Sequence, residues 1–263
     1  NSFTILPRKG EYMLLDHSAN CMSRVIFQTP SPMGKGVLVS PTVDDNAFAG
    51  PTAQNQDDRE DVETTDAGMA VIRQLSVKSV PQINLRGVIT SFASLRAQAS
   101  TNDFVIGPSE AAPHFLNAAG ICSPGLTSAP AIADAIVDML AEAGLAMEDK
   151  QEFDPRRPAI RRFAEMTREE REAAIAENPL YGRVICRCET ITEAEIVEAI
   201  RRGARSLDAV KRRTRAGMGR CQGGFCSPRV MDIISRETGM PMTEVTKFGG
   251  ESKLLVGVLK EVL

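Results

Sequence analysis

Cys186-Arg187-Cys188 and, about 32 residues further on, Cys221-Gln222-Gly223-Gly224-Phe225-Cys226 hold four of the six cysteines of the chain. Thiolates grouped in this way usually serve a metal site, because sulfur is the soft ligand that iron–sulfur clusters and zinc prefer. The fold of this half must bring the two pairs together. We therefore expect the second half to be organised around a four-cysteine site.

The segment around the cysteines has the pattern of short helices. Thr192 is followed three residues later by Glu195, which is the pattern of a capping box at the start of a helix. Ser206 is a second predicted N-cap, and Ser227-Pro228 opens a third helix whose N-terminus is expected to face the cysteines. The spacing therefore predicts a small helical domain. The predicted helices cover 193–202, 207–215 and 227–237.

The composition sets the broad class. With 263 residues, 43% of them hydrophobic and 25% charged, the chain has room for two globular domains. A net charge of -3 does not indicate a nucleic-acid partner. No apolar run approaches the roughly 20 residues of a membrane helix, and the first residues lack a signal-peptide pattern. We therefore expect a cytoplasmic protein with no membrane span, in which clustered cysteines are ligands rather than disulfides.

The first half is rich in short apolar segments separated by turn residues. Thr65 is a predicted N-cap for an amphipathic helix over 66–77. These patterns predict an α+β domain with a mostly antiparallel sheet. The predicted strands are 11–15, 24–29, 36–40, 46–50, 83–92, 104–107 and 115–119, with a hairpin loop at 30–35.

A Gly/Pro-rich turn, Gly120–Thr127, links the last of these strands to a predicted apolar helix over 128–142. The first N–H groups of a helix have no intrahelical partners, and the helix dipole favours negative charge there. The turn therefore suits an anion or a dipole. An ordinary strand-to-helix connection is the alternative that spacing alone leaves open.

Residues 120–133, GICSPGLTSAPAIA, resemble the C-terminal flavin-contacting motif of FAD-dependent oxidoreductases of the glycerol-3-phosphate dehydrogenase and D-amino-acid oxidase superfamily. Residues 9–12, 36–53 and 91–96 resemble members that act on glycerol 3-phosphate or small hydroxy acids. The resemblance implies that Arg96 clamps an anionic substrate group, which a guanidinium fork does well. A surface ion pair is the alternative role for Arg96. The implied flavin contacts are Gly120, Ile121, Pro124, Gly125, Leu126 and Thr127.

Such flavoproteins begin with a βαβ unit that carries G-x-G-x-x-G and binds the ADP part of FAD. No such unit stands near the start of this chain. The chain is therefore interpreted as the C-terminal portion of a longer enzyme whose N-terminal FAD-binding region lies elsewhere. We expect this portion alone to bind FAD poorly or not at all, and to be inactive on its own.

A charged, proline-punctuated stretch over 147–158 has the character of a linker. It is followed by a predicted helix over 167–177, with Thr167 as N-cap, that we interpret as a bridging element. The predicted division is a partial flavoprotein substrate domain over 1–147, a linker and bridging helix over 148–180, and a helical [2Fe–2S]-binding domain with a C-terminal tail over 181–263. The tail is predicted to end in an apolar helix.

The sequence CRCETITEAEIVEAI…GMGRCQGGFC resembles the [2Fe–2S] domain of bacterioferritin-associated ferredoxin, in particular the form fused to the large subunits of anaerobic glycerol-3-phosphate dehydrogenases. The resemblance implies a [2Fe–2S] cluster on Cys186, Cys188, Cys221 and Cys226. A closed zinc site with the same ligands is the alternative. Cys21 and Cys122 are expected to be small buried hydrophobic residues.

These patterns lead to one main functional hypothesis. It is a flavin-dependent dehydrogenase that oxidises glycerol 3-phosphate or a similar small hydroxy acid, with electrons passing from FAD to the cluster and then to an electron-accepting subunit. The alternative is a non-catalytic electron-transfer or assembly subunit that uses the cysteines as a relay or a structural zinc site. Arginine is dense over 201–220, which suits either an acidic partner or solvated helix faces.

Overall fold

The computed structural model describes residues 3–30, 36–257 and 259. The chain divides into two compact units, Asn1–Asp154 and Pro155–Leu263. Each unit has its own hydrophobic core. Residues 31–35 of the predicted loop, and residues 258 and 260–263 of the predicted C-terminal helix, lie outside the described residues.

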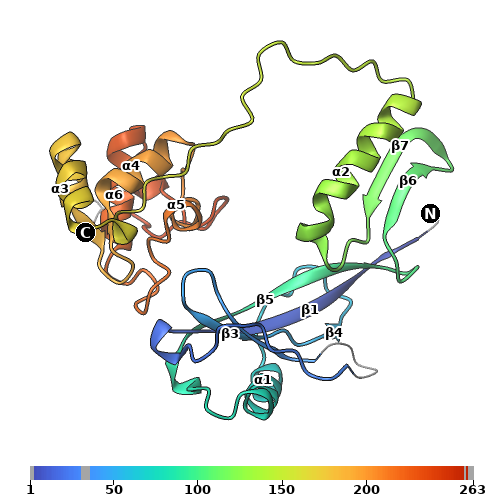
Figure 1. The fold of residues 1–263 in the computed structure, drawn as a ribbon, viewed down its shortest axis with the longest axis horizontal. Coiled ribbons are helices and arrows are strands. Elements are labelled where there is room, and N and C mark those ends of the chain that lie inside the picture. Colours follow the sequence, from blue (N-terminus) through green and yellow to red (C-terminus); the bar gives the residue numbers. More distant parts are fainter. Residues whose placement is uncertain (1–2, 31–35, 258, 260–263) are drawn as a thin grey trace. The chain divides into compact units, whose positions relative to one another are not determined.

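The first unit is built on a sheet in which every strand pairing is antiparallel. Its two long strands, β1 (Ile5–Leu15) and β5 (Val88–Ala99), pair along their whole length. The other edge of β1 pairs with β3 (Ala47–Gly50) and β4 (Gln54–Asn55), and β2 (Leu38–Pro41) completes the sheet beside β3 (Figure 1). The predicted α+β class with an antiparallel sheet is confirmed.

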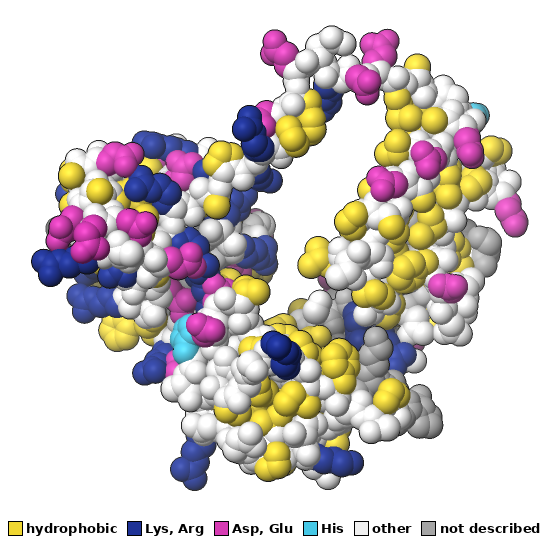
Figure 2. Space-filling model, in the orientation of Figure 1, with side chains coloured by type: hydrophobic (Ala, Val, Ile, Leu, Met, Phe, Trp, Pro, Cys, Tyr) yellow, Lys and Arg dark blue, Asp and Glu magenta, His cyan; other side chains and the backbone are white. Residues whose placement is uncertain are grey.

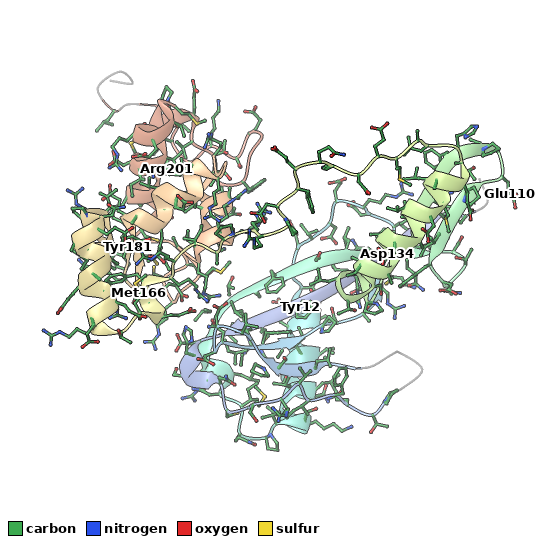
Figure 3. The ribbon with its side chains drawn as sticks, turned by 45° about the horizontal axis from the view of Figure 1, so that its top comes forward. Tyr12, Glu110, Asp134, Met166, Tyr181 and Arg201 are labelled. Carbon is green, nitrogen blue, oxygen red and sulfur yellow. The ribbon has the colours of Figure 1, made fainter. Side chains whose placement is uncertain are left out.

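The helix α1 (Asp66–Ser79) packs on one face of this sheet. β1 alternates, so that Met13 and Leu15 are buried in the core beneath α1, together with Ile72 of the helix. The helix begins as predicted, because the side chain of Thr65 accepts a hydrogen bond from the N–H of Gly68. The opposite face of β1 is free of α1, and it presents Tyr12 (Figure 3).

A second layer of the first unit is a hairpin of β6 (Val105–Ser109) and β7 (Ala112–Ala119) that packs against α2 (Gly125–Glu142). No residue of α2 is buried, although the helix is strongly apolar. Figure 2 shows hydrophobic side chains gathered over this region. None of the described helices is long and apolar enough to cross a membrane.

Several predicted elements of the first unit differ from the structure. β1 begins at Ile5, six residues before the start of the strand predicted over 11–15. Residues 24–29 form no strand, because Ile26 makes only an isolated bridge to Val39. The segment predicted as a strand over 83–92 begins with a 3-10 turn, η2 (Leu85–Gly87), before β5 starts at Val88. The helix α2 begins at Gly125 rather than at Ser128, so three residues of the predicted turn belong to its first turn.

The second unit is mostly helical. Its hydrophobic core consists of residues from α4, α5 and α6 together with Cys186 and Cys226. Capping boxes open α3 and α4, as their sequences predict. The elements are η3 (Phe163–Glu165), α3 (Arg168–Glu177), η4 (Pro179–Gly182), β8 (Val184–Cys186), β9 (Ile191–Thr192), α4 (Glu193–Arg201), α5 (Leu207–Thr214), α6 (Ser227–Thr238) and η5 (Met242–Glu244). β8 and β9 pair as an antiparallel hairpin. The remaining 3-10 turn, η1 (His17–Ala19), belongs to the first unit.

The segment that precedes the cysteines is packed into the second unit. Phe163 is buried, and its ring stacks on Tyr181 at a centroid distance of 6.2 Å (Figure 3 labels Tyr181). The N–H of Phe163 donates to Oε1 of Glu195, the buried capping residue of α4. Ile160 and Leu180 pack against the same core. Residues 155–180 therefore contribute to the core that surrounds the cysteines.

Candidate functional site

The four cysteines predicted as ligands line one cavity of about 360 Å³ in the second unit. Cys186 ends β8, and Cys226 directly precedes α6. The sulfurs lie as two pairs, since Cys188 and Cys221 are 3.7 Å apart and Cys186 is hydrogen-bonded to Cys226. Side chains that are far apart in the sequence are thus brought to one place.

Backbone N–H groups are directed at the sulfurs: Cys186 accepts from Gly217 and Glu189, Cys221 accepts from Phe225 and Gly223, and Cys188 accepts from Cys221. The hydrogen bond with Cys226 lowers the pKa of the Cys186 thiol to about 6, and the same bond raises the pKa of Cys226. The N–H of Phe225 likewise lowers the pKa of Cys221. Such donors stabilise bound thiolates, so the residues present fit a thiolate-ligated group.

Gly219 allows the two cysteine-bearing segments to approach closely. A Cβ added at this position would lie 2.3 Å from the Cβ of Cys188 and 3.4 Å from its Sγ. The loop is held by Gln222, whose side-chain amide donates to the carbonyl oxygens of Met218 and Gly219. A residue with a side chain at 219 would therefore displace Cys188.

The arrangement of the sulfurs bears on the choice between zinc and a cluster. Within the described ranges, no three His, Cys, Asp or Glu side chains converge as ligands of one metal ion. A structural zinc site needs all its ligands on a single ion, whereas four cysteines are shared between two irons in a [2Fe–2S] cluster. The two pairs of sulfurs around one cavity supply the four thiolates that a [2Fe–2S] cluster requires.

Four further residues, which the sequence reasoning did not single out as a group, line the same cavity: Ile185, Arg187, Phe225 and Arg229. Phe225 is 85% exposed, which is unusual for a large apolar side chain. Neither arginine forms an ion pair within the described part of the chain. The only sequence signal was the position of Arg187 and Phe225 between ligand cysteines.

Arg96 lies on β5, and its guanidinium is positioned over β1 at the face opposite α1. Its Nη2 donates to the carbonyl oxygen of Thr52 at 3.0 Å. Gly10 makes room for it, because a Cβ at that position would lie 3.3 Å from Nη2. The Nε of Arg96 is buried and has no hydrogen-bond partner among the described residues. The guanidinium is therefore oriented by one contact and retains donor capacity.

Aromatic side chains stand next to Arg96 on the same face. Tyr12 stacks on Phe92 at a centroid distance of 5.2 Å and meets Phe48 edge-on. Burial raises the pKa of Tyr12, and the positive charge of Arg96 opposes part of this rise. The sequence reasoning found Arg96 through a motif, but it did not associate Tyr12 or Phe92 with it.

The predicted flavin turn leads from β7 into α2. Gly120 has a φ of +67°, and a Cβ there would lie 2.5 Å from the Cβ of Ala99. Glycine is thus required at this position by both conformation and space. Ile121 is partly buried, Pro124 is the N-cap residue, and Gly125, Leu126 and Thr127 form the first turn of α2. The first N–H groups of α2 point out of its N-terminal end and have no acceptors within the helix.

The two remaining cysteines are not where they were expected. Cys21 is exposed and Cys122 is partly exposed, so the prediction that both are buried is wrong. Cys21 lies in an irregular segment after η1, and Cys122 lies in the turn before α2, where neither is covered by a core. Both cysteines belong to the first unit, and neither lines the cavity of the four-cysteine site.

Comparison with known families assigns both halves of the chain. Residues 1–139 match the FAD dependent oxidoreductase family, and residues 184–236 match the BFD-like [2Fe-2S] binding domain. The solved structure of dithionite-reduced L-alpha-glycerophosphate oxidase from Mycoplasma pneumoniae with FAD bound resembles 58% of this chain, with a TM-score of 0.53 and 32% identity; this chain covers 40% of that one.

Curated relatives point the same way. The glycerol 3-phosphate dehydrogenase of Caloramator mitchellensis is 48% identical over 263 residues, which are 99% of this chain and 55% of that protein. The glycerol 3-phosphate oxidase of Mycoplasma genitalium is 35% identical over 158 residues, 59% of this chain and 40% of the relative. The chain thus spans about half the length of the curated relatives it matches. It belongs to the FAD-dependent oxidoreductase family and carries a BFD-like [2Fe–2S]-binding domain in its second unit.

Proposed function

We propose that this chain is part of an FAD-dependent dehydrogenase that oxidises glycerol 3-phosphate and passes the electrons to a [2Fe–2S] cluster bound by Cys186, Cys188, Cys221 and Cys226. The observation that carries the proposal is the meeting of four thiols at one cavity in a chain of the FAD-dependent oxidoreductase family. The names of the similar dehydrogenase and oxidase support the substrate.

In this proposal, the cysteine cavity provides one-electron transfer when a [2Fe–2S] cluster is bound. The protein contributes its four thiolates, and the N–H donors at Cys186 and Cys221 stabilise negative charge on the sulfurs. Gly219 and Gln222 fix the separation of the two ligand segments. These residues determine how well the site is preorganised before a cofactor enters.

On the first unit, we propose that Arg96 binds the anionic group of the substrate. Its free donor capacity suits a phosphate, since a guanidinium can donate two parallel hydrogen bonds to such a group. Tyr12 and Phe92 stack on each other on the same face of the sheet. Thr52 holds the guanidinium in place through its carbonyl oxygen.

We propose that the Gly120–Thr127 turn would contact FAD, whose chemistry at this site would be the acceptance of a hydride. The proposal rests on the unpartnered N–H groups at the start of α2, which favour the negative charge of a reduced flavin. Gly120 lets the chain turn sharply from β7 into this position. We further propose that the rest of the flavin site is formed by a region equivalent to the part of the longer relatives that this chain does not span.

The electron acceptor is proposed to be an acidic protein subunit that meets the second unit at Arg187, Phe225 and Arg229. An exposed aromatic residue at the same cavity as two arginines that have no ion-pair partner among the described residues suits such a surface. A reducing, cytoplasmic location is part of the same proposal, because it keeps the clustered thiols available as ligands.

The cofactor assignment is tested by purifying the chain without oxygen and measuring iron, zinc and the EPR spectrum after reduction with dithionite. We expect two irons per chain and an S = 1/2 signal. Cys221→Ser should lose both, while the matched control Cys21→Ser should keep them, because Cys21 belongs to the first unit. A colourless protein with stoichiometric zinc would contradict the proposal in favour of a structural site.

The substrate assignment is tested in the full-length enzyme with Arg96→Met. Loss of charged hydrogen bonds should lower kcat/KM for glycerol 3-phosphate by about 10- to 100-fold, mainly through KM, and Arg96→Lys should restore part of it. Arg73→Met, on the exposed side of α1, is the control of equal charge change. Equal kinetics in the Arg96 and Arg73 variants would remove Arg96 from the substrate site.

A further inference from the structure

A buried ion pair joins the two segments that carry the cysteines. Nε of Arg215 lies 2.7 Å from Oε2 of Glu189. The side chains are only 18% and 6% exposed, whereas the ion pair of Glu198 and Arg202 in the same unit is 38% and 30% exposed. Glu189 directly follows the first cysteine pair, and Arg215 stands shortly before the second.

Glu189 is in direct contact with the ligand site. Its backbone N–H donates to the sulfur of Cys186. Its Oε1 lies near Gly219, since a Cβ added to that glycine would be 3.0 Å away from it. The same added atom would touch Cys188, so the carboxylate, Gly219 and Cys188 are packed together. A full negative charge therefore lies next to the cysteine ligands.

Arg215 is held in a special backbone conformation that brings it to this carboxylate. It caps the C-terminus of α5 with a φ of +73°, a left-handed value that is uncommon for a residue other than glycine. The expected residue at such a cap is glycine, and the chain places Gly217 two residues further on. The conformation is explained if the guanidinium must reach Glu189.

We propose that the Glu189–Arg215 pair sets the reduction potential of the cysteine-ligated group, a role that rests on the proposed [2Fe–2S] function. Charges on side chains that are mostly buried are weakly screened by solvent, so each acts strongly on a nearby redox centre. Reduction adds one negative charge to the site. The carboxylate opposes this charge and the guanidinium favours it, and the pair keeps the two effects in balance.

The proposal makes predictions of opposite sign for the two partners. Glu189→Gln removes a negative charge beside the site and should raise the midpoint potential. Arg215→Gln removes a positive charge beside the site and should lower it. A pair that only holds the loops together would instead give loss of iron in both variants and no opposite shifts. The double variant, Glu189→Gln with Arg215→Gln, restores the net charge and should return the potential toward that of the wild type.

The experiment is an EPR-monitored potentiometric titration of the full chain, purified without oxygen, for the wild type, the two single variants and the double variant. Glu198→Gln and Arg202→Gln are the matched controls, because they make the same charge changes at the C-terminal end of α4 in the more exposed pair. We expect their potentials to stay within the error of the wild type. Iron content and thermal unfolding of each variant, with and without iron, report separately on folding.

The outcomes separate this inference from the proposed function. Iron-loaded variants that show shifts of the same sign, or no shift, overturn the inference and leave the cluster assignment intact. Variants that fold without iron while the wild type holds it also overturn the inference, since the pair would then be structural. A wild-type chain that binds zinc and shows no EPR signal overturns the function and the inference together.

Discussion

Gly219 fixes the approach of the two cysteine segments, and its replacement is a direct test of the site. In Gly219→Ala the new Cβ would lie 2.3 Å from the Cβ of Cys188, so the cysteine must move. We expect loss of most of the bound iron and a decrease of about 1–3 kcal/mol in the free energy of unfolding. Gly182→Ala is the control, because its nearest contact is an ordinary 3.6 Å. Equal iron content in the two variants would contradict the role of Gly219.

Glu195 predicts a pH dependence of stability. Burial raises the pKa of its carboxyl above 4.5, and this effect outweighs the hydrogen bonds from Thr192 and Phe163. The folded state therefore binds the proton more tightly than the unfolded chain, so the free energy of unfolding falls as the pH rises above 4.5. Urea unfolding of the second unit from that pH to neutrality should show a fall that is absent in Glu195→Gln. If the free energy of unfolding changes with pH in the same way in the wild type and in Glu195→Gln, then Glu195 is not the source of the pH dependence.

At the scale of residues, the sequence predicts what depends on spacing. The four cysteines and the capping pair Thr192 and Glu195 were identified because their partners are near in the chain or repeat a known pattern. The pairing of Glu189 with Arg215 was not predicted, since it depends on a left-handed turn at a residue that does not favour one. For Cys21 and Cys122, burial was inferred from residue type alone, and their exposed positions show the weakness of that inference.

Among the elements, α1 offers a test in which helix propensity and packing disagree. Gly68 lies in its first turn, and alanine there should stabilise the helix by up to about 1 kcal/mol from propensity alone. In the structure, however, an added Cβ would lie 1.5 Å from Oε2 of the buried Glu11. We therefore expect Gly68→Ala to destabilise the first unit by about 1–3 kcal/mol in urea unfolding.

The control for this test is Gly125→Ala, in the first turn of α2, where the nearest atom to a new Cβ is 3.5 Å away. This substitution should leave the free energy of unfolding of the first unit within about 0.5 kcal/mol of the wild type. If Gly68→Ala is as stable as Gly125→Ala, the side chain of Glu11 can move away from the new Cβ without lowering the free energy of unfolding. That result would contradict the packing described.

The sequence predicted elements well where hydrophobic period and caps agree. α1, α3 and α4 begin at their predicted N-caps because the signals are local. The apolar segment over 24–29 has strand composition but forms no strand, since it pairs with the sheet only at Ile26. Whether a strand forms is decided by its partner, which composition does not reveal. The early start of α2 has a similar origin, because Pro124 caps the helix without a side-chain hydrogen bond.

On the scale of the whole chain, the boundary of the second unit is open to direct measurement. We expect residues 155–263, expressed alone, to fold and to bind iron. Residues 181–263 should be less stable by about 3 kcal/mol or more, because they lack Phe163, which is buried, and the core contacts of Ile160 and Leu180. Thermal unfolding and iron content compare the two fragments. Equal stability would place the boundary at residue 181.

A linker and bridging helix over 148–180 were predicted from charge and proline content, and those signals carry no information on packing. The structure groups residues 155–180 with the second unit. The contacts responsible are long-range in the sequence, such as the hydrogen bond from Phe163 to Glu195. The family of each half, by contrast, could be predicted from short motifs, because cofactor sites require particular residues at fixed spacing.

The carboxylate of Glu11 accepts hydrogen bonds from the N-cap Thr65 and from Thr52, and Thr52 in turn holds Arg96 through its carbonyl oxygen. Gly68 closes the space around the same carboxylate. A change at one of these positions alters what the others can tolerate. In an alignment of homologues we expect positions 11, 65 and 68 to covary. Homologues with a shorter side chain at position 11 should be the ones that carry a residue other than glycine at position 68. Substitutions in β1 and at the start of α1 are therefore expected to occur together.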